Sequence, residues 1–120
     1  MIDTIPSLPD RVMGFSAKGT VTARDYRSMI IPAVDTMISR HGKIRLLYYL
    51  GPDFSGFDSA ALWQDAKIGL RHLYAWDRIA VVSDVKWIRA VSKLFGFVLH
   101  GEVRAYRNGE LAAARKWVTE

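Results

Sequence analysis

Two nearly continuous apolar runs in the middle of the chain predict buried strands, at residues 44–50 (IRLLYYL) and 79–82 (IAVV). Runs of this kind are typical of strands that are covered on both faces of a parallel sheet. Residues 2–5 and 11–18 predict two more strands, and the proline-containing turn between them favours an antiparallel hairpin. Residues 102–107 alternate between polar and apolar side chains, which predicts a strand near a sheet edge.

The segment after the hairpin has apolar residues at helical spacing and predicts the first helix. Thr22 and Asp25 form a capping-box pattern, so this helix should begin at Thr22. Pro32 lies inside the pattern and should kink the helix, because proline removes one backbone donor. Gly42 is expected to end the helix.

Three further helices are predicted between and after the central strands. One follows Asp58, its expected N-cap, and another should run from residue 83 or 84 to Gly96. The last is predicted over residues 110–118. The helix after Asp58 should bury a stripe made of Leu62, Ala66, Gly69 and Leu73.

The order of these elements, ββαβαβαβα, places the chain in the α/β class with right-handed crossovers. We expect a single domain over residues 1–120. Its predicted architecture is a mostly parallel mixed sheet of about five strands with an antiparallel N-terminal edge hairpin, covered by about four helices.

The composition narrows the chemistry without naming a function. The 120 residues carry a net charge of +5 that is spread along the chain, which fits solubility as well as attraction to anionic surfaces. No cysteine is present, which excludes disulfides, a thiolate zinc site and a cysteine nucleophile. No signal peptide or membrane-spanning run is recognised, so we expect a cytoplasmic protein, at most peripheral at the inner membrane.

A specific pattern of residues extends over most of the chain. The motif Leu-Trp-x-Asp-x-Lys-x-Gly-x-x-His spans residues 62–72, and it is followed by the run Arg78–Val82. Together with Gly19, Asp25-Tyr26 and His41–Arg45, these residues resemble the SpoIIAA-like family of small bacterial proteins. The resemblance implies a STAS/CRAL-TRIO-like fold, like those of the anti-anti-sigma proteins and the CRAL-TRIO lipid carriers. It implies no known reaction, and it suggests hydrophobic-ligand binding and membrane association.

Two phosphate-related motifs are incomplete. The glycine loop at residues 51–56 is not followed by the Lys and the Ser or Thr of a Walker A loop. The partner-switching STAS proteins that the chain resembles are phosphorylated within an Asp-Ser-Ser or Asp-Ser-Thr motif. Here Ser59 is followed by Ala60, which disfavours phosphorylation at Ser59. Partner switching through protein–protein contacts is kept as the alternative function.

No catalytic constellation is recognised in the sequence. Asp65 and His72 share a helix face but lie about 10 Å apart along the axis, too far to pair as a base and its orienting group. The histidines His41, His72 and His100 lie in separate segments without metal-binding spacing. We therefore expect a non-enzymatic protein with no catalytic residue, no metal and no cofactor.

Aromatic and basic residues on the two central helices favour a binding site instead. We expect a small hydrophobic or lipid-like ligand to lie between the sheet and these two helices. Trp63 and Trp87 would supply apolar walls. Lys67, Lys86 or His72 would meet a negative headgroup.

The helix after residue 83 also predicts a membrane-contact surface. Basic residues on one stripe beside exposed aromatic residues are typical of a helix at a membrane interface. The candidate contacts are Trp87, Arg89, Lys93, Phe95 and Phe97. A homodimer through this helix or the edge hairpin is left open, whereas nucleic acid is not expected because helices should cover the sheet.

Overall fold

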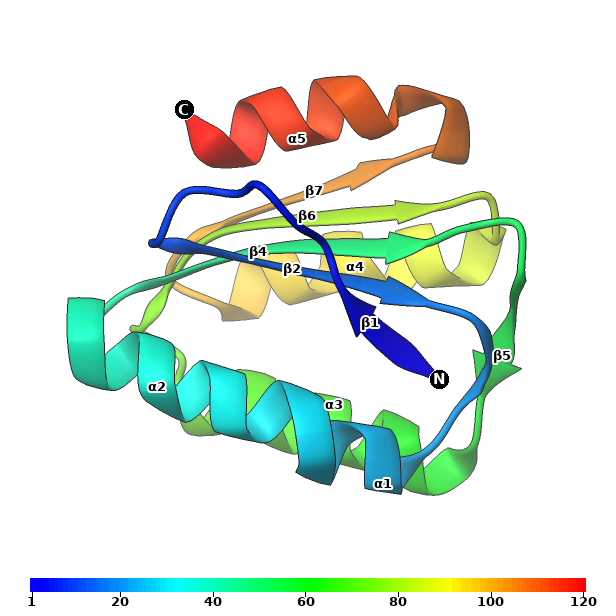
Figure 1. Cartoon of the computed structure of the whole chain (residues 1–120), viewed down its shortest axis with the longest axis horizontal. Coiled ribbons are helices and arrows are strands. Elements are labelled where there is room, and N and C mark those ends of the chain that lie inside the picture. Colours follow the sequence, from blue (N-terminus) through cyan, green and yellow to red (C-terminus); the bar gives the residue numbers. More distant parts are fainter.

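The computed structural model describes the whole chain, except for the side chains at Gly69 and Leu70. Five strands form one mixed sheet in the order β1-β2-β4-β6-β7 (Figure 1). Strand β1 is antiparallel to β2, and all other neighbours are parallel, which confirms the predicted fold class. The strands are β1 (Ile2–Thr4), β2 (Val12–Ala17), β4 (Ile44–Leu50), β6 (Trp76–Ser83) and β7 (Glu102–Tyr106).

Helices cover both faces of this sheet (Figure 1). One face carries α5 (Leu111–Thr119), which follows the short 3₁₀ helix η2 (Asn108–Glu110). The opposite face carries α1 (Ala23–Asp25), the π-helical segment η1 (Tyr26–Ile30), α2 (Ile31–His41), α3 (Ser59–Arg71) and α4 (Lys86–Val98).

Strand β4 contributes to two hydrophobic cores, one on each face. Leu46, Tyr48 and Leu50 belong to the core under α1–α4, whereas Leu47 belongs to the core under α5. Side chains alternate between the two faces of a strand, so a strand covered on both sides needs apolar residues at nearly every position. The continuous apolar run in the sequence has this origin.

The first predicted helix is divided by a π-helical segment. Thr22 caps its start, with a capping box to Asp25 as predicted. Pro32 falls in the first turn of α2, immediately after η1, so the expected disturbance takes the form of a π-helical turn. Gly42 ends α2 with a positive φ of 71°, which confirms the predicted stop.

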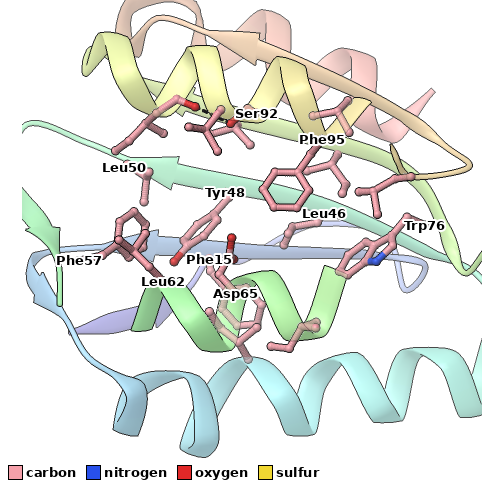
Figure 2. Close-up of a pocket in the computed structure, with 18 of the residues that line it drawn as sticks. Phe15, Leu46, Tyr48, Leu50, Phe57, Leu62, Asp65, Trp76, Ser92 and Phe95 are labelled. Atoms are coloured by element: carbon pink, nitrogen blue, oxygen red, sulfur yellow. Dashed lines mark hydrogen bonds between the residues drawn. The ribbon is translucent and has the colours of Figure 1, made fainter. Parts of the chain in front are cut away.

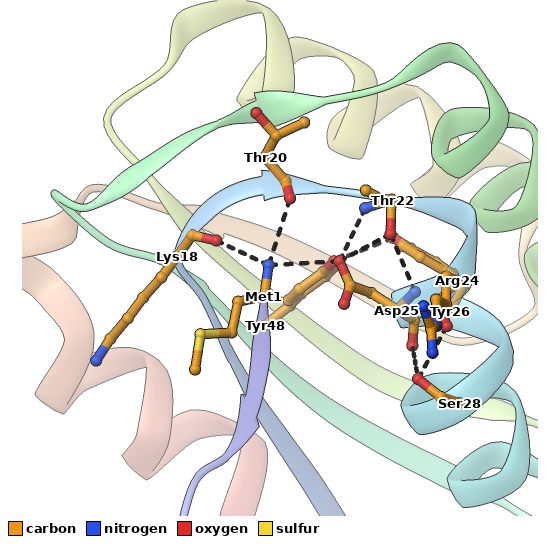
Figure 3. A network of polar contacts seen from close by, with 9 residues as sticks. All are labelled: Met1, Lys18, Thr20, Thr22, Arg24, Asp25, Tyr26, Ser28 and Tyr48. Carbon is orange, nitrogen blue, oxygen red and sulfur yellow. Dashed lines mark hydrogen bonds and ion pairs between the residues drawn. The ribbon is translucent and has the colours of Figure 1, made fainter.

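The N-terminal ammonium fastens the edge strand β1 to the start of α1 (Figure 3). It donates to the carbonyl oxygens of Lys18 and Thr20 at 2.9 and 3.3 Å and pairs with Oδ2 of Asp25 at 3.4 Å. Partial burial raises the pKa of Asp25, but the hydrogen bond from the Thr22 backbone and the ammonium of Met1 outweigh it. The pKa of Asp25 is therefore lowered from its ordinary value.

A second, two-stranded sheet was not predicted from the sequence. Strand β3 (Gly19–Val21) pairs in parallel with β5 (Phe54–Phe57), within the glycine loop that was examined for phosphate binding. The loop instead leads into α3, where Asp58 accepts a hydrogen bond from the backbone N–H of Ala61 at 2.6 Å. Asp58 is therefore the N-cap of α3, as predicted.

The predicted bounds of α4 were wrong at both ends. Strand β6 continues to Ser83, whose Oγ accepts a hydrogen bond from the Val85 backbone, and α4 begins at Lys86. Gly96 does not end the helix, which continues to Val98. The helix continues because Leu99, directly after it, is buried in the core and its N–H bonds to the Phe95 carbonyl.

Two arginines from the sheet hold the C-terminal end of α5. Arg45 donates to the carbonyl of Val118 at 3.2 Å and pairs with Asp77 at 2.7 Å. Arg78 donates to the carbonyl of Trp117 at 2.8 Å. Cationic donors at the last helical carbonyls satisfy groups that have no partner within the helix. Arg45 and Arg78, which are among the residues that resemble the SpoIIAA-like family, therefore have a structural role on the α5 face.

Candidate ligand-binding cavity

A cavity of about 120 Å³ lies between the sheet and helices α3 and α4 (Figure 2). Sheet residues that line it include Phe15, Leu46, Tyr48, Leu50, Trp76 and Val81. Helix α3 contributes Leu62, Asp65 and Ile68, and helix α4 contributes Trp87, Ile88, Val91, Ser92 and Phe95. The lining is therefore almost entirely apolar, and a small set of polar groups interrupts it.

Helix α3 presents a different face to the core from the one predicted. Ala61 is fully buried, whereas Leu62 is 41% exposed at the rim of the cavity. Asp65 lies on the inner face, one turn after Ala61. The predicted stripe is therefore wrong at Leu62, while Leu73 does pack against the core and Gly69 lies outside the described side chains.

Asp65 accepts a hydrogen bond from Tyr26, whose hydroxyl is in turn bonded to that of Tyr48. The hydroxyl of Tyr26 donates to Oδ1 of Asp65 at 2.8 Å and lies 3.0 Å from the hydroxyl of Tyr48. Since the hydrogen of Tyr26 is directed to Asp65, Tyr48 must donate to Tyr26. The result is a chain of hydrogen bonds from the sheet through η1 to α3.

Burial disfavours the charged form of every group in this chain. Desolvation raises the pKa of Asp65, although the hydrogen bond from Tyr26 partly opposes the increase. Burial, followed by the nearby Asp65 charge, raises the pKa of Tyr26 well above its usual value. Burial also raises the pKa of Tyr48. Asp65 is thus an acidic group in an apolar environment, and both tyrosines stay protonated.

Trp76 provides a second buried polar atom at the cavity. Its side chain is 5% exposed, and its Nε1–H has no hydrogen-bond acceptor among the described residues. Figure 2 shows Trp76 at one end of the lining, Leu50 and Phe57 at the other, and Asp65 between them. An unpaired buried donor destabilises a fold by about 1–3 kcal/mol. Because Nε1 has almost no accessible surface, Trp76 lines the cavity with the carbon atoms of its ring and not with this N–H.

Helix α4 has apolar residues on two separate faces. The inner stripe, Ile88, Ser92, Phe95 and Leu99, faces the cavity and the core. The outer stripe, Trp87, Val91, Leu94 and Val98, is exposed. Next to the outer stripe, Phe97 is 88% exposed. Trp87 and Val91 also line the cavity, so the apolar residues of α4 that packing leaves unused are Leu94, Phe97 and Val98.

Of the predicted ligand contacts, the structure places Trp87 alone in the cavity wall. Trp63 is 65% exposed and is not part of the lining. Lys67 and His72 line a separate hollow between α3 and α2, and Lys86 is exposed at the start of α4. The predicted basic contacts therefore do not meet the cavity, because helical spacing alone does not show which face of α3 is covered.

The predicted membrane contacts are also divided by the structure. Trp87, Lys93 and Phe97 are exposed on α4. Phe95 turns inward to the cavity, and Arg89 donates to the carbonyl of Ser83 at 2.9 Å. Arg89 and Phe95 are both partly buried, and membrane contact through these five residues stays a prediction.

Asp65 and His72 do not share a cleft. Asp65 lines the cavity under the sheet, while His72 lines the hollow on the α2 side. Among the described residues, no three His, Asp or Glu side chains gather as a metal site would require. Ser59 and Ala60 are exposed in the first turn of α3, and partner switching stays a prediction.

The hydrogen-bonded pair of Tyr26 and Tyr48 was missed by reasoning from the sequence. Apolar spacing indicates only that Tyr26 lies in a helix and Tyr48 in a buried strand. The sequence did carry one signal, because a buried tyrosine hydroxyl needs a hydrogen-bond partner. The partner could not be chosen, since Asp65 lies 39 residues from Tyr26 in the chain.

The SpoIIAA-like family model matches residues 12–119, which is nearly the whole chain. The chain belongs to the SpoIIAA-like family. A crystal structure of an uncharacterised protein of the DUF3478 family with a SpoIIAA-like fold, from Shewanella loihica PV-4, is similar to it with a TM-score of 0.76. The two are 22% identical, and the similarity covers 98% of this chain and 92% of the other. No curated protein matches the chain.

The SpoIIAA-like assignment settles the fold but leaves the activity to be argued from the cavity. The Shewanella protein is uncharacterised, and its identity to this chain supports the fold alone. Within the described part of the chain, no helix has the length and apolar character to cross a bilayer.

Proposed function

We propose that this SpoIIAA-like protein binds a small apolar ligand in the cavity between the sheet, α3 and α4. The observation that carries the proposal is the cavity itself, which has an almost entirely apolar lining interrupted by the partly buried carboxyl group of Asp65. Small-molecule sites generally combine apolar walls with a few polar atoms that fix orientation.

The size of the cavity restricts the ligand. A volume of about 120 Å³ is close to that of an engineered apolar cavity of about 150 Å³ that accepts benzene. A ligand of one ring or a short chain therefore fits without rearrangement. A lipid-like ligand requires α3 and α4 to move apart.

The entrance lies between α3 and α4. Leu62 from α3 and Trp87 and Val91 from α4 line the cavity and are also exposed at the surface. These three side chains form a rim of apolar groups that contact both solvent and the interior. Displacing them opens the cavity without breaking strand pairing in the sheet.

Native mass spectrometry of the purified protein, followed by organic extraction, tests the proposal. We expect a bound apolar molecule, or uptake of added ligands of one ring. Ser92→Leu should abolish uptake by filling the cavity, while Ala90→Leu, an equal enlargement on the exposed side of α4, should not. A wild-type protein that never carries or takes up an apolar molecule contradicts the proposal.

A second function, contact with an anionic membrane, is favoured by the outer stripe of α4. Leu94, Phe97 and Val98 are 64%, 88% and 53% exposed, and Lys93 lies among them. Apolar side chains that enter the headgroup region beside lysines are typical of interfacial helices. Because the same helix borders the cavity, membrane contact would bring the entrance to a source of apolar ligand.

Sedimentation with anionic and neutral liposomes tests membrane contact. Lys93→Glu should weaken binding to anionic liposomes about tenfold, and Phe97→Ser should weaken it as well. Lys116→Glu changes the net charge equally but lies on α5, across the sheet, so it should have a smaller effect. Equal losses from the two charge reversals would show that binding depends on net charge rather than on α4.

A further inference from the structure

The cavity wall contains an acidic side chain but no basic one among the described residues. Asp65 is the acidic residue of the lining, and no Lys, Arg or His is among the described residues that line it. Gly69 and Leu70, whose side chains are not described, carry no charge by residue type. The basic residues that were expected to meet a headgroup lie outside, Lys67 and His72 in a separate hollow and Lys86 on the surface.

An anionic ligand such as a fatty acid is therefore excluded on electrostatic grounds. A buried anion needs a cation or several donors to replace its water, and the wall offers it a neighbouring carboxyl group instead. A cationic ligand is also disfavoured. It would have to lose its hydration for a single buried carboxyl that is already engaged with Tyr26 and whose protonated form burial favours.

The polar atoms of the wall fit a hydroxyl group. Asp65 accepts one hydrogen bond from the described residues, at Oδ1, and its side chain extends from α3 toward the cavity (Figure 2). A carboxylate has capacity for further donors, and a carboxylic acid can donate. A hydroxyl can serve both states, because it donates and accepts.

We infer that the cavity selects an uncharged, ring-sized apolar molecule that carries a hydroxyl group, such as a simple phenol or a short alcohol, with the hydroxyl bonded to Asp65. This inference rests on the proposed ligand-binding function and specifies its ligand class. The size limit follows from the volume of about 120 Å³, and the hydroxyl follows from the hydrogen-bonding capacity that Asp65 has left after its bond from Tyr26.

Four probes of similar size separate the alternatives by isothermal titration calorimetry at neutral pH. They are 4-methylphenol, toluene, benzoate and benzylammonium. We expect 4-methylphenol to bind at least about tenfold more tightly than toluene, as one hydrogen bond to a buried acidic group allows. Benzoate and benzylammonium should bind more weakly than 4-methylphenol. Equal binding of toluene, or tighter binding of either ion, overturns the inference and leaves the ligand-binding function standing.

Failure of the proposed function has a different signature, since none of the four probes would then bind. Asp65→Leu should remove most of the preference for 4-methylphenol over toluene while toluene binding persists. Because this variant changes the core and could alter folding, an NMR resonance of the wild-type protein provides an independent test. The carboxyl ¹³C resonance of Asp65, identified by its loss in Asp65→Asn, should shift further with 4-methylphenol than with toluene. The carboxyl resonance of Asp77, which is paired with Arg45 on the α5 face, is an internal reference that should not respond.

Discussion

Asp25 and Asp65 have the same type of side chain but opposite environments, one near the surface and one facing an apolar cavity. Asp25 lies near the surface with an ammonium and a backbone N–H beside it, which lowers its pKa. Asp65 faces an apolar cavity with one tyrosine donor, and desolvation raises its pKa. Folding therefore favours the ionised form of Asp25 and the protonated form of Asp65.

Asp65 should make the protein less stable as the pH rises. A carboxyl group whose folded pKa is raised contributes stability that is fully present below its unfolded pKa, about 3.9, and is lost as pH rises through the folded value. Relative to Asp65→Asn, the wild-type free energy of unfolding should therefore decrease as the pH rises above about 4. Urea unfolding of both proteins across this range measures the difference, and a difference independent of pH contradicts the assignment.

Asp25 should show the reverse dependence. Its folded pKa is depressed, so its contribution is present above the unfolded pKa and is lost as pH falls through the folded value. Asp25→Asn should thus destabilise the protein near neutral pH, and the difference from wild type should shrink in acid. The same urea titrations test this, and the physical cause is the loss of the negative charge beside the Met1 ammonium, since asparagine keeps an oxygen that can accept from the Thr22 backbone.

At the scale of elements, two glycines near helix ends have different roles. Gly42 stops α2 because its backbone adopts a positive φ of 71°, a conformation that costs other residues energy. Gly96 lies inside α4, where an added Cβ would meet Val103 at an ordinary 3.7 Å. The residue type is identical in both places, so it does not decide by itself whether the helix ends. The packing of the residues after each glycine also contributes.

Substituting each glycine with alanine should change stability in opposite directions. Gly96→Ala should stabilise the protein by about 0.5–1 kcal/mol, because alanine favours the helix and the site has room. Gly42→Ala should destabilise it by about 1–2 kcal/mol, because the left-handed conformation must be kept. Thermal and urea unfolding measure both effects. A destabilised Gly96→Ala would show that Val103 cannot adjust.

At the scale of the whole molecule, α3 makes its main contacts, among the described residues, with other helical segments rather than with the sheet. It packs mainly on α1 and η1, and the cavity separates it from the strands. A second hollow lies on its α2 side. Segments with few packed neighbours open locally at lower free energy than the central strands. The helix that carries Asp65 and Leu62 is therefore the one that can move to admit a ligand.

Hydrogen exchange should reveal this difference in local stability. We expect amides of α3 to exchange faster than those of β4 and β6, and binding of 4-methylphenol to slow exchange in α3 and α4. Amides of α5, on the opposite face, should change little and serve as the control. Mass spectrometry of peptides from the labelled protein resolves these segments. Equal protection of α3 and β4 would contradict a movable α3.

The sequence by itself determined the order of strands and helices, the hairpin at the sheet edge, and the caps at Thr22, Asp58 and Gly42. Each depends on local spacing or on backbone conformation, which neighbouring residues set. The small β3–β5 sheet, the end of α4 and the inner face of α3 were decided by the tertiary structure. In particular, a polar residue on a helix usually predicts solvent contact. Asp65 faces the cavity instead, because Tyr26 donates a hydrogen bond to it and Tyr48 bonds to Tyr26, both from distant segments. The cavity is formed by contacts between residues far apart in the sequence, and spacing along the chain cannot specify such contacts.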